Sequence, residues 1–317
     1  MPDTKKIATR DSYGRALLEL ADAGCNDLVV LDSDLSVSTK TCLFRDAYPN
    51  RFFECGIAEQ NMMGVAAGLS TFGYVPFASS FAMFAAGRAY EQVRNSIGYP
   101  HLNVKIGATH GGLSVGEDGA SHQCCEDFAL MRSIPGMVVL CPADDVEARA
   151  AVKAAYRYKG PVYMRFCRLP VPVFHDELNY SFEIGRGEQL TDGFDVAVIS
   201  TGLMTGEALK AAVALKKQGI AVRVINMPCI KPLDEDLVLR AARDCKHIIT
   251  VEEHSVIGGL GEAVCALLSE KLPTPVRRIG VPDQFGHSAP AWEVLSDCGL
   301  DADHLTAAIL EFIDKKN

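Results

Sequence analysis

The chain has 317 residues, of which 48% are hydrophobic and 22% are charged, a balance typical of about two globular domains. Its net charge of -9 argues against a general affinity for nucleic acid, and no apolar run reaches the roughly 18 residues of a membrane span. The opening Met-Pro-Asp-Thr-Lys-Lys lacks the apolar stretch of a signal peptide, so we expect a cytoplasmic protein that binds neither nucleic acid nor membrane.

Predicted strands and helices alternate along the first half of the chain. Continuous apolar runs predict buried strands, and 3.6-residue periods predict helices. In chain order we expect a helix over 11–23, a strand over 28–31, a helix over 59–71, a strand over 74–78, a helix over 85–97, strands over 104–108 and 137–141, a helix over 144–158 and a strand over 161–166. This alternation favours a parallel sheet with helices on both faces.

The second half repeats the alternation. We expect a strand over 195–200, a helix over 205–217, strands over 221–227 and 247–252, and a helix over 258–268. The stretch 170–181 contains two prolines and has no clear period, so it is interpreted as a linker. The sequence therefore predicts an α/β protein of two doubly wound domains, over 1–185 and 186–317.

The eleven cysteines are scattered and include no Cys-x-x-Cys pair. Cys124 and Cys125 are adjacent, which suits neither an ordinary disulfide nor a zinc ribbon. We expect reduced thiols that serve as small hydrophobic residues.

Glu59 opens an otherwise small and apolar segment, 62–69, which predicts a buried helix. Burying a carboxylate is costly unless a partner binds it. The helix N-terminus favours its charged form, whereas an apolar environment favours its neutral form. Opposed pressures of this kind suit a group that shares a proton with a ligand nitrogen. The alternative is a glutamate that caps the helix or is exposed.

The stretch 109–123 follows a predicted strand and contains four glycines, two histidines (His110 and His122) and the pair Glu117-Asp118. Glycines permit close approach of a ligand, and ligands bind at the carboxyl ends of parallel strands. The histidines fit no standard metal spacing, so no metal ligand is assigned. A glycine-rich connection without chemistry is the alternative.

Two further groups of residues are candidates for binding. Phe81 and Phe84 could form a platform for a flat ring, although phenylalanines near a strand end more often belong to the core. Cationic and hydroxyl groups that could bind an anion, or in the arginines' case form buried salt bridges, are Arg10, Ser38, Arg165 and Arg168.

Two patterns late in the chain could mislead. Gly258-Gly259-x-Gly261 is a weak match to a nucleotide-binding loop. Glu252-Glu253-His254 has the composition of a metal cluster, but a surface run at a strand end explains it equally well.

Three motifs, taken together, resemble the C-terminal half of transketolase over essentially the whole chain. They are Gly56-Ile57-Ala58-Glu59-Gln60-Asn61-Met62, Ser79-Ser80-Phe81-Ala82-Met83-Phe84 and Gly116-Glu117-Asp118-Gly119-x-x-His122-Gln123. The resemblance implies a parallel-sheet pyrimidine-binding domain, a smaller mixed-sheet C-terminal domain, and thiamine diphosphate as cofactor.

The resemblance also implies roles for the candidate residues. Glu59 matches the glutamate that bonds the cofactor's pyrimidine nitrogen, and Phe81 and Phe84 match the aromatics that pack against the pyrimidine. His122 and Asp118 match residues that contact substrate hydroxyls. The residues that match the set binding the sugar phosphate are Arg10, Ser38, His110 and Arg168, with Arg165 as the other candidate for the second arginine.

No Gly-Asp-Gly occurs in the sequence, although this motif marks the diphosphate and metal domain of full-length transketolase. The resemblance therefore implies a split transketolase. A separate N-terminal subunit would supply the diphosphate site and hold Mg or Ca, most simply in a two-plus-two assembly. The expected reaction transfers a two-carbon ketol unit from a ketose phosphate to an aldose phosphate.

Related proteins offer alternatives to this interpretation. The nearest is the beta subunit of a 2-oxoacid dehydrogenase, against which the Gly-Glu-Asp-Gly-x-x-His-Gln loop and the phosphate-binding set argue. Deoxyxylulose phosphate synthase shares the fold but departs in the middle region. A noncatalytic regulatory partner is disfavoured because Glu59, Asp118 and His122 are intact.

Overall fold

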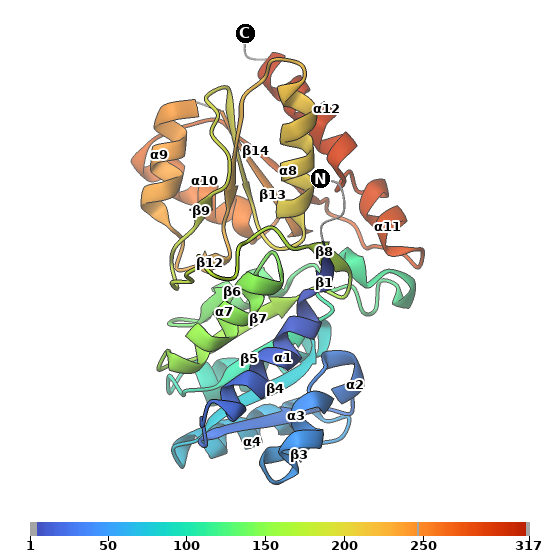
Figure 1. Ribbon diagram of the computed structural model, residues 1–317, viewed down its shortest axis with the longest axis vertical. Helices are drawn as coiled ribbons and strands as arrows, with labels where there is room; N and C mark the ends of the chain where they lie inside the picture. The colour runs from blue at the N-terminus through green and yellow to red at the C-terminus, as the bar shows by residue number, and fades with distance from the viewer. Residues whose placement is uncertain (1–4, 246, 315–317) are drawn as a thin grey trace.

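The computed structural model describes residues 5–245 and 247–314. Residues 1–4 of the opening segment considered above lie outside the described ranges. The chain forms two α/β domains stacked end to end, the first in blue to green and the second in yellow to red (Figure 1). The expected fold class is confirmed.

The first domain is built on a seven-stranded sheet in the order β12-β6-β7-β5-β4-β2-β3. Its strands are β2 (Leu28–Asp32), β3 (Phe52–Glu54), β4 (Val75–Phe81), β5 (Lys105–Thr109), β6 (Val138–Leu140), β7 (Val162–Phe166) and β12 (Cys229–Lys231). All are parallel except β12. Every residue of the four central strands is buried, because helices cover both faces of the sheet.

The helical segments of the first domain lie on the two faces of this sheet. They are α1 (Thr9–Asp22), α2 (Ser36–Thr39), α3 (Cys42–Ala47), η1 (Pro49–Arg51), α4 (Glu59–Thr71), η2 (Met83–Arg88), α5 (Tyr90–Gln92), η3 (Val93–Gly98), η4 (Leu113–Asp118), α6 (Asp127–Arg132) and α7 (Asp145–Arg157). The single helix expected over 85–97 is instead three consecutive pieces, of which η2 and η3 are π-helical. Short π-helical turns of this kind are frequent at functional sites.

The second domain has a five-stranded mixed sheet in the order β14-β13-β10-β11-β9. Its strands are β9 (Glu188–Gln189), β10 (Val196–Ser200), β11 (Val222–Asn226), β13 (Ile248–Ser255) and β14 (Val276–Val281), and only β9 is antiparallel to its neighbour. Its helices are α8 (Met204–Lys216), α9 (Glu235–Cys245), α10 (Leu260–Lys271), α11 (Ala291–Asp297) and α12 (Ala302–Asp314).

The two domains are joined by strand pairing and by a common hydrophobic cluster. Strand β12 follows β11 of the second domain in sequence but pairs with β6 of the first sheet. The expected linker over 170–181 also contains a strand, β8 (Pro170–Pro172), which pairs with β1 (Lys6–Ala8). One hydrophobic cluster is continuous from Val29 in the first domain to Val264 in the second. The domains therefore pack as one unit, with a core shared between them.

All eleven cysteines are free, and five of them are buried. Within the described ranges, no helix is both long and apolar enough to cross a membrane.

Candidate active site

The predicted site residues gather at the carboxyl edge of the first sheet. Parallel strands end at the same edge, so the segments that follow them lie together. Ser38 follows β2, Glu59 follows β3, Phe81 ends β4, His110 follows β5 and Arg168 follows β7.

Glu59 is the first residue of α4 and is only 1% exposed. Its Oε2 atom accepts a hydrogen bond from Nη1 of Arg88 at 2.9 Å. The Arg88 side chain is 48% exposed, so the cation of this pair reaches the surface while the carboxylate lies beneath it. The expectation of a buried carboxylate at this helix start is confirmed.

The composition of α4 predicts a helix that is buried on all sides, but only one of its faces is buried. One face, formed by Asn61, Gly64, Val65 and Gly68, is exposed because only the opposite face packs on the sheet. At the two ends of the helix, Ile57 is 76% exposed and Phe72 is 85% exposed. The chain thus presents exposed apolar side chains along α4, of which Ile57 lies two residues before Glu59.

Aromatic rings form a platform beside Glu59. The ring centroids of Phe81 and Phe84 lie 5.9 Å apart, with planes 18° from parallel. The ring of His122 meets Phe84 edge-on at 5.3 Å. The guanidinium of Arg88 lies 4.5 Å from the Phe84 centroid, which is a cation–π distance. Glu59 and the platform are therefore joined through Arg88.

His110 connects this platform to a cationic cluster. Its ring stacks on Phe81 at 3.9 Å, and its Nε2 atom lies 2.9 Å from Nη1 of Arg10. Because a guanidinium can only donate, Nε2 accepts, and Nδ1–H then donates to Oγ1 of Thr109 at 2.9 Å. Burial, together with the charges of Arg10 and Arg168, lowers the pKa of His110 to about 3. His110 is therefore a neutral member of the cluster.

Arg10 and Arg168 bring two guanidinium groups to the same place. Arg10 donates to the carbonyl of Ser38 at 3.3 Å, whereas Arg168 donates to the Val115 carbonyl and to Oε2 of Glu117 at 2.8 Å. Burial lowers the pKa of Arg10, and the charge of Arg168 lowers it further, although Asp11 acts in the opposite direction. Two cations that destabilise each other in this way favour an anionic ligand.

Asp118 and His122 lie on the glycine-rich loop that follows β5. Asp118 is exposed at the end of η4, and His122 is half-buried with Nδ1 2.9 Å from Oγ of Ser121. His122 contacts the rings of Phe81 and Phe84, so a ligand on the aromatic platform could reach it.

Arg165, the other candidate for the second phosphate arginine, does not join the cluster. It is buried in β7, where it donates to the Glu253 carbonyl at 2.8 Å and lies 3.5 Å from Asp127. Its guanidinium also lies 4.6 Å from the ring centroid of Phe128. Since these contacts occupy its donors, Arg168 is the arginine that this geometry favours.

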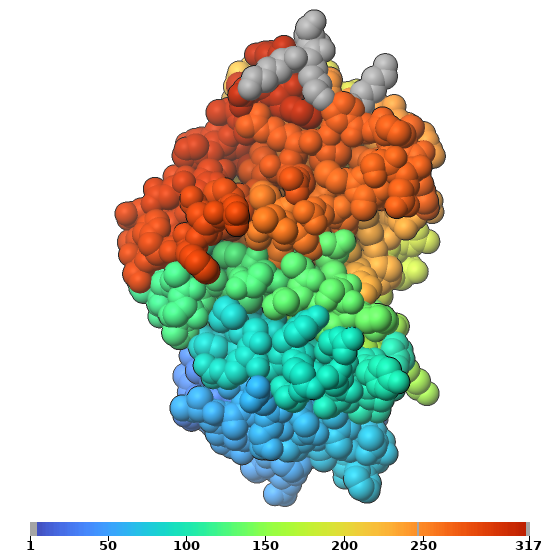
Figure 2. Space-filling view, turned by 180° about the vertical axis from the view of Figure 1, so that it is seen from behind, coloured from blue at the N-terminus to red at the C-terminus, as the bar shows by residue number. Residues whose placement is uncertain are grey.

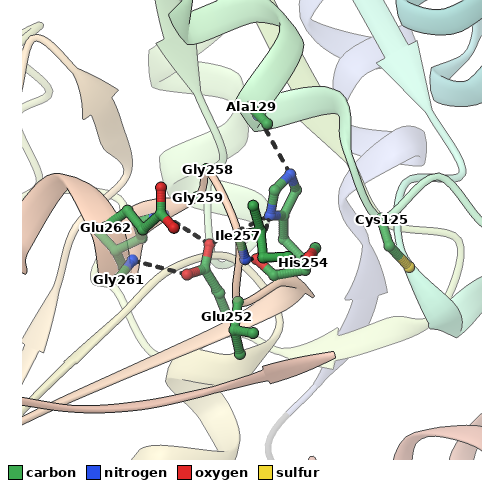
Figure 3. A network of polar contacts seen from close by, with 12 residues as sticks. Cys125, Ala129, Glu252, His254, Ile257, Gly258, Gly259, Gly261 and Glu262 are labelled. Atoms are coloured by element: carbon green, nitrogen blue, oxygen red, sulfur yellow. Dashed lines mark hydrogen bonds and ion pairs between the residues drawn. The ribbon is translucent and has the colours of Figure 1, made fainter. Parts of the chain in front are cut away.

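The surface interpretation of Glu252-Glu253-His254 is wrong, because all three side chains are buried. Glu252 accepts hydrogen bonds from the amides of Leu260 and Gly261, each at 2.7 Å (Figure 3). The amides at the start of α10, which a nucleotide-binding loop would offer to a phosphate, are thus occupied by a carboxylate of the same chain.

His254 links the second domain to the first. Its Nδ1–H donates to the Ser255 carbonyl at 2.7 Å, and its Nε2 accepts from the amide of Ala129 at 3.3 Å (Figure 3). Burial lowers the pKa of His254 to about 4, so the ring is neutral. In the described part of the chain, no group of three or more His, Cys, Asp or Glu residues is arranged to hold a metal ion.

Sequence reasoning missed Arg88 and Glu253, which contact the candidate site. Arg88 lies 29 residues from Glu59 in the sequence, and Glu253 belongs to the other domain. A cation needed to balance the buried Glu59 was the one available signal, but nothing in the sequence pattern indicates which cation it is.

A buried carboxylate, an aromatic platform and a cationic cluster thus lie at the sheet edge where two-domain α/β proteins commonly bind ligands. The sequence model of the transketolase pyrimidine-binding domain matches residues 5–173, and that of the transketolase C-terminal domain matches residues 185–305. The chain belongs to the transketolase family, as its motifs predict.

Similar proteins match nearly the whole chain. A transketolase C-terminal section from Methanocaldococcus jannaschii is 48% identical over 97% of this chain and 96% of that protein. The 6-deoxy-6-sulfo-D-fructose transketolase subunit SqwH from a Clostridium species is 41% identical over 97% of this chain and 95% of that protein. A solved structure described as a split gene transketolase, inactive beta4 tetramer, is 52% identical, with a TM-score of 0.91 and coverage of 98% of this chain and 100% of that chain.

Proposed function

We propose that this chain is the C-terminal subunit of a split, thiamine diphosphate-dependent transketolase. The enzyme would transfer a two-carbon ketol unit from a ketose phosphate to an aldose phosphate. A separate N-terminal subunit would hold the cofactor's diphosphate and its divalent metal ion.

The observation that carries this proposal is one continuous set of contacts across the sheet edge. It runs from the buried Glu59 through Arg88 to Phe84 and the other rings, and from His110 to Arg10. A flat, nitrogen-containing ring needs a carboxylate for its nitrogen and an apolar face for its body. Glu59 and the Phe81–Phe84 pair supply these two elements, so the residues present fit the pyrimidine of thiamine diphosphate.

When bound, thiamine diphosphate supplies a nucleophilic carbon and stabilises the negative charge that carbon–carbon bond cleavage creates. The protein's part is to orient the reactants and to hold protons. Glu59 would hold a proton between its carboxylate and the pyrimidine nitrogen, and Phe81 and Phe84 would keep water from the ring. His122, at the edge of the platform, would bond substrate hydroxyl groups, and Asp118 would contact a hydroxyl from the exposed loop.

The cationic cluster supports a phosphorylated substrate. Arg10 and Arg168 provide two guanidinium forks, and Ser38 and His110 provide polar groups beside them. Guanidinium groups suit a dianionic phosphate. The relative named for 6-deoxy-6-sulfo-D-fructose is assigned a sugar with a terminal sulfonate, which is also an anion. The shared requirement is an anionic group at the end of the sugar.

The exposed apolar surface around α4 supports a partner subunit. Exposed apolar side chains that are contiguous commonly mark a protein interface. Ile57 is exposed two residues before Glu59, and Val65 and Phe72 are exposed further along α4 and at its end, so a partner bound along this helix and over Ile57 would enclose the cofactor's pyrimidine. The similar split-gene transketolase, described as an inactive beta4 tetramer, is consistent with a requirement for a second kind of subunit.

The test is to purify this chain alone and together with a candidate N-terminal transketolase subunit from the same organism. Ketol transfer is then measured with phosphorylated donors and acceptors in the presence of thiamine diphosphate and Mg²⁺. We expect activity only from the complex. Full activity of the isolated chain would overturn the split arrangement, and a complex that forms but transfers no ketol unit would overturn the proposed reaction.

A further inference from the structure

Strand β13 of the second domain carries two adjacent buried carboxylates that face different partners. Glu252 is 1% exposed and caps α10 within its own domain. Glu253 is 6% exposed, and its Oε1 atom accepts a hydrogen bond from the amide of Ser114 in the first domain. Successive residues of a strand point to opposite faces, which explains the division.

Two glycines let Glu253 and Arg165 lie directly against the backbone that follows His110. A Cβ atom on Gly111 would lie 2.0 Å from Nε of Arg165. One on Gly112 would lie 2.5 Å from Cδ of Glu253, and Gly112 also has a positive φ of 79°. The loop therefore takes this path only with glycine at these positions, because any other side chain would displace Glu253 and Arg165.

The contact reaches the phosphate cluster in two steps along the backbone. Ser114, bound by Glu253, precedes Val115, whose carbonyl accepts a hydrogen bond from Arg168. On the other side, the amide of Gly112 donates to the Cys124 carbonyl at 2.8 Å, and Arg165 donates to that same carbonyl at 3.3 Å. The loop is thus held at Ser114 by Glu253 and at Gly112 by the Cys124 carbonyl, which Arg165 also binds.

One buried cation faces two buried carboxylates in this network. Burial raises the pKa of Glu253, while Arg165 and the Ser114 amide act to lower it. Arg165 lies between Glu253 and Asp127, so one buried cation serves two carboxylates. The hydrogen bond from the Ser114 amide to the Glu253 side chain ties the loop to strand β13.

We propose that Glu253 is a positioning residue through which the second domain holds the 110–118 loop in the conformation that binds the substrate phosphate. This inference rests on the proposed function, since it takes the Arg10–Arg168 cluster as the phosphate site. Glu253 touches no substrate; it acts through the Ser114 amide and Val115 on Arg168. The second domain thereby contributes to substrate affinity without contributing a group to the site.

The chain contains a reporter for this loop in its single tryptophan, Trp292. Trp292 lies in α11, which packs against η4, and the neighbouring Ala291 approaches the loop so closely that a Cβ on Gly116 would lie 3.0 Å from it. Figure 2 shows the red C-terminal segment resting on the green part of the first domain. Trp292 fluorescence should therefore change when an anion binds beside the loop.

The experiment titrates the full chain with inorganic phosphate and with ribose 5-phosphate, by Trp292 fluorescence and by calorimetry. Glu253→Ala should weaken both affinities about tenfold, which corresponds to about 1.4 kcal/mol. Glu253→Gln, which keeps an acceptor oxygen for the Ser114 amide, should weaken them less, about threefold. Glu253→Asp keeps the charge but shortens the side chain, so it tests whether the carboxylate must extend as far as the Ser114 amide. This variant remains informative if the alanine variant does not fold.

Glu252→Gln is the matched control, because it alters the neighbouring buried carboxylate without touching the loop. We expect it to lower the free energy of unfolding and to leave phosphate affinity within twofold of wild type. In the assembled enzyme, Glu253→Ala should raise KM for phosphorylated donors more than it lowers kcat.

Equal losses of phosphate affinity in the Glu252 and Glu253 variants would overturn the proposal, as would unchanged affinity in every Glu253 variant. Weaker phosphate binding by the Glu253 variants, in a chain whose complex transfers no ketol unit, would uphold the positioning role and refute the proposed function alone.

Discussion

The carboxylate of Glu59 and the guanidinium of Arg88 form a 2.9 Å ion pair between a buried group and a half-exposed one. The guanidinium of Arg88 also lies over the ring of Phe84, and Arg88 is the last residue of the π-helical segment η2. The amide of the Gln60 side chain donates to the Arg88 carbonyl at 3.2 Å, which fixes the backbone of the cation to α4. The proposed proton partner of the cofactor therefore has a dedicated counter-ion.

We expect this pair to be energetically coupled. Arg88→Met should lower the free energy of unfolding by about 1–3 kcal/mol, because it leaves a buried carboxylate without its cation. In a double-mutant cycle with Glu59→Gln, the coupling energy should be about 1–2 kcal/mol, measured by urea unfolding. The exposed pair Arg278–Glu262 is the control and should show less than about 1 kcal/mol of coupling. Additive effects at Glu59 and Arg88 would show that the contact is incidental.

The role proposed for Glu59 predicts a large effect on cofactor activation. In the assembled enzyme, Glu59→Gln should slow proton exchange at the reactive carbon of thiamine diphosphate at least about 100-fold, the usual scale for a lost acid–base group. Exchange is followed by NMR in deuterated buffer, and cofactor affinity is measured separately. A variant that binds the cofactor and exchanges at the wild-type rate would remove Glu59 from the mechanism.

The cationic cluster predicts discrimination by charge. Arg10→Ala and Arg168→Ala should each raise KM for a phosphorylated donor at least tenfold, since a charge-assisted hydrogen bond is worth about 1.5–3 kcal/mol. KM for an unphosphorylated donor should change little, and Arg277→Ala, in the other domain, should change neither value. Arg165→Lys should act differently, through reduced stability. An equal rise of KM for both donors would show that the cluster does not recognise the phosphate group.

Much of this site could be predicted because it depends on one local rule. A continuous apolar run such as 28–31 predicts a buried parallel strand, and parallel strands bring their carboxyl ends together. Ser38, Glu59 and His110 therefore converge, although the sequence separates them widely. Glu59 was identifiable because a carboxylate is out of place at the start of an apolar helix.

The remainder depends on contacts between segments that no local pattern relates. Strand β12 has three residues and joins the first sheet only because the domains pack together. Arg165 and Arg168 are equivalent in the sequence, yet β7 buries the first while the second reaches Glu117. The composition of Glu252-Glu253-His254 fits a surface as well as a metal site, and only tertiary packing reveals that it is a buried domain contact.

The domain boundary holds another buried charge network, centred on His175. Its Nδ1 lies 3.0 Å from Oδ1 of Asp144 in the first domain, and its Nε2 lies 2.9 Å from Oε2 of Glu188 in β9. Burial alone lowers the pKa of His175, but these two carboxylates outweigh burial and raise the pKa to about 10. The folded protein therefore holds a proton here that the unfolded chain releases near pH 6.5.

Because the folded pKa is the higher one, the stabilisation from His175 should be complete below about pH 6.5 and should disappear as the pH rises through about 10. The difference in unfolding free energy between wild type and His175→Gln, measured in urea at several pH values, should shrink across this window by on the order of 2–4 kcal/mol. Glu188→Gln removes the more exposed of the two carboxylates, so it should reduce the pH dependence without abolishing it. A difference that is constant from pH 6 to pH 10 would mean that His175 is neutral in the folded protein and that the domain contact does not depend on its charge.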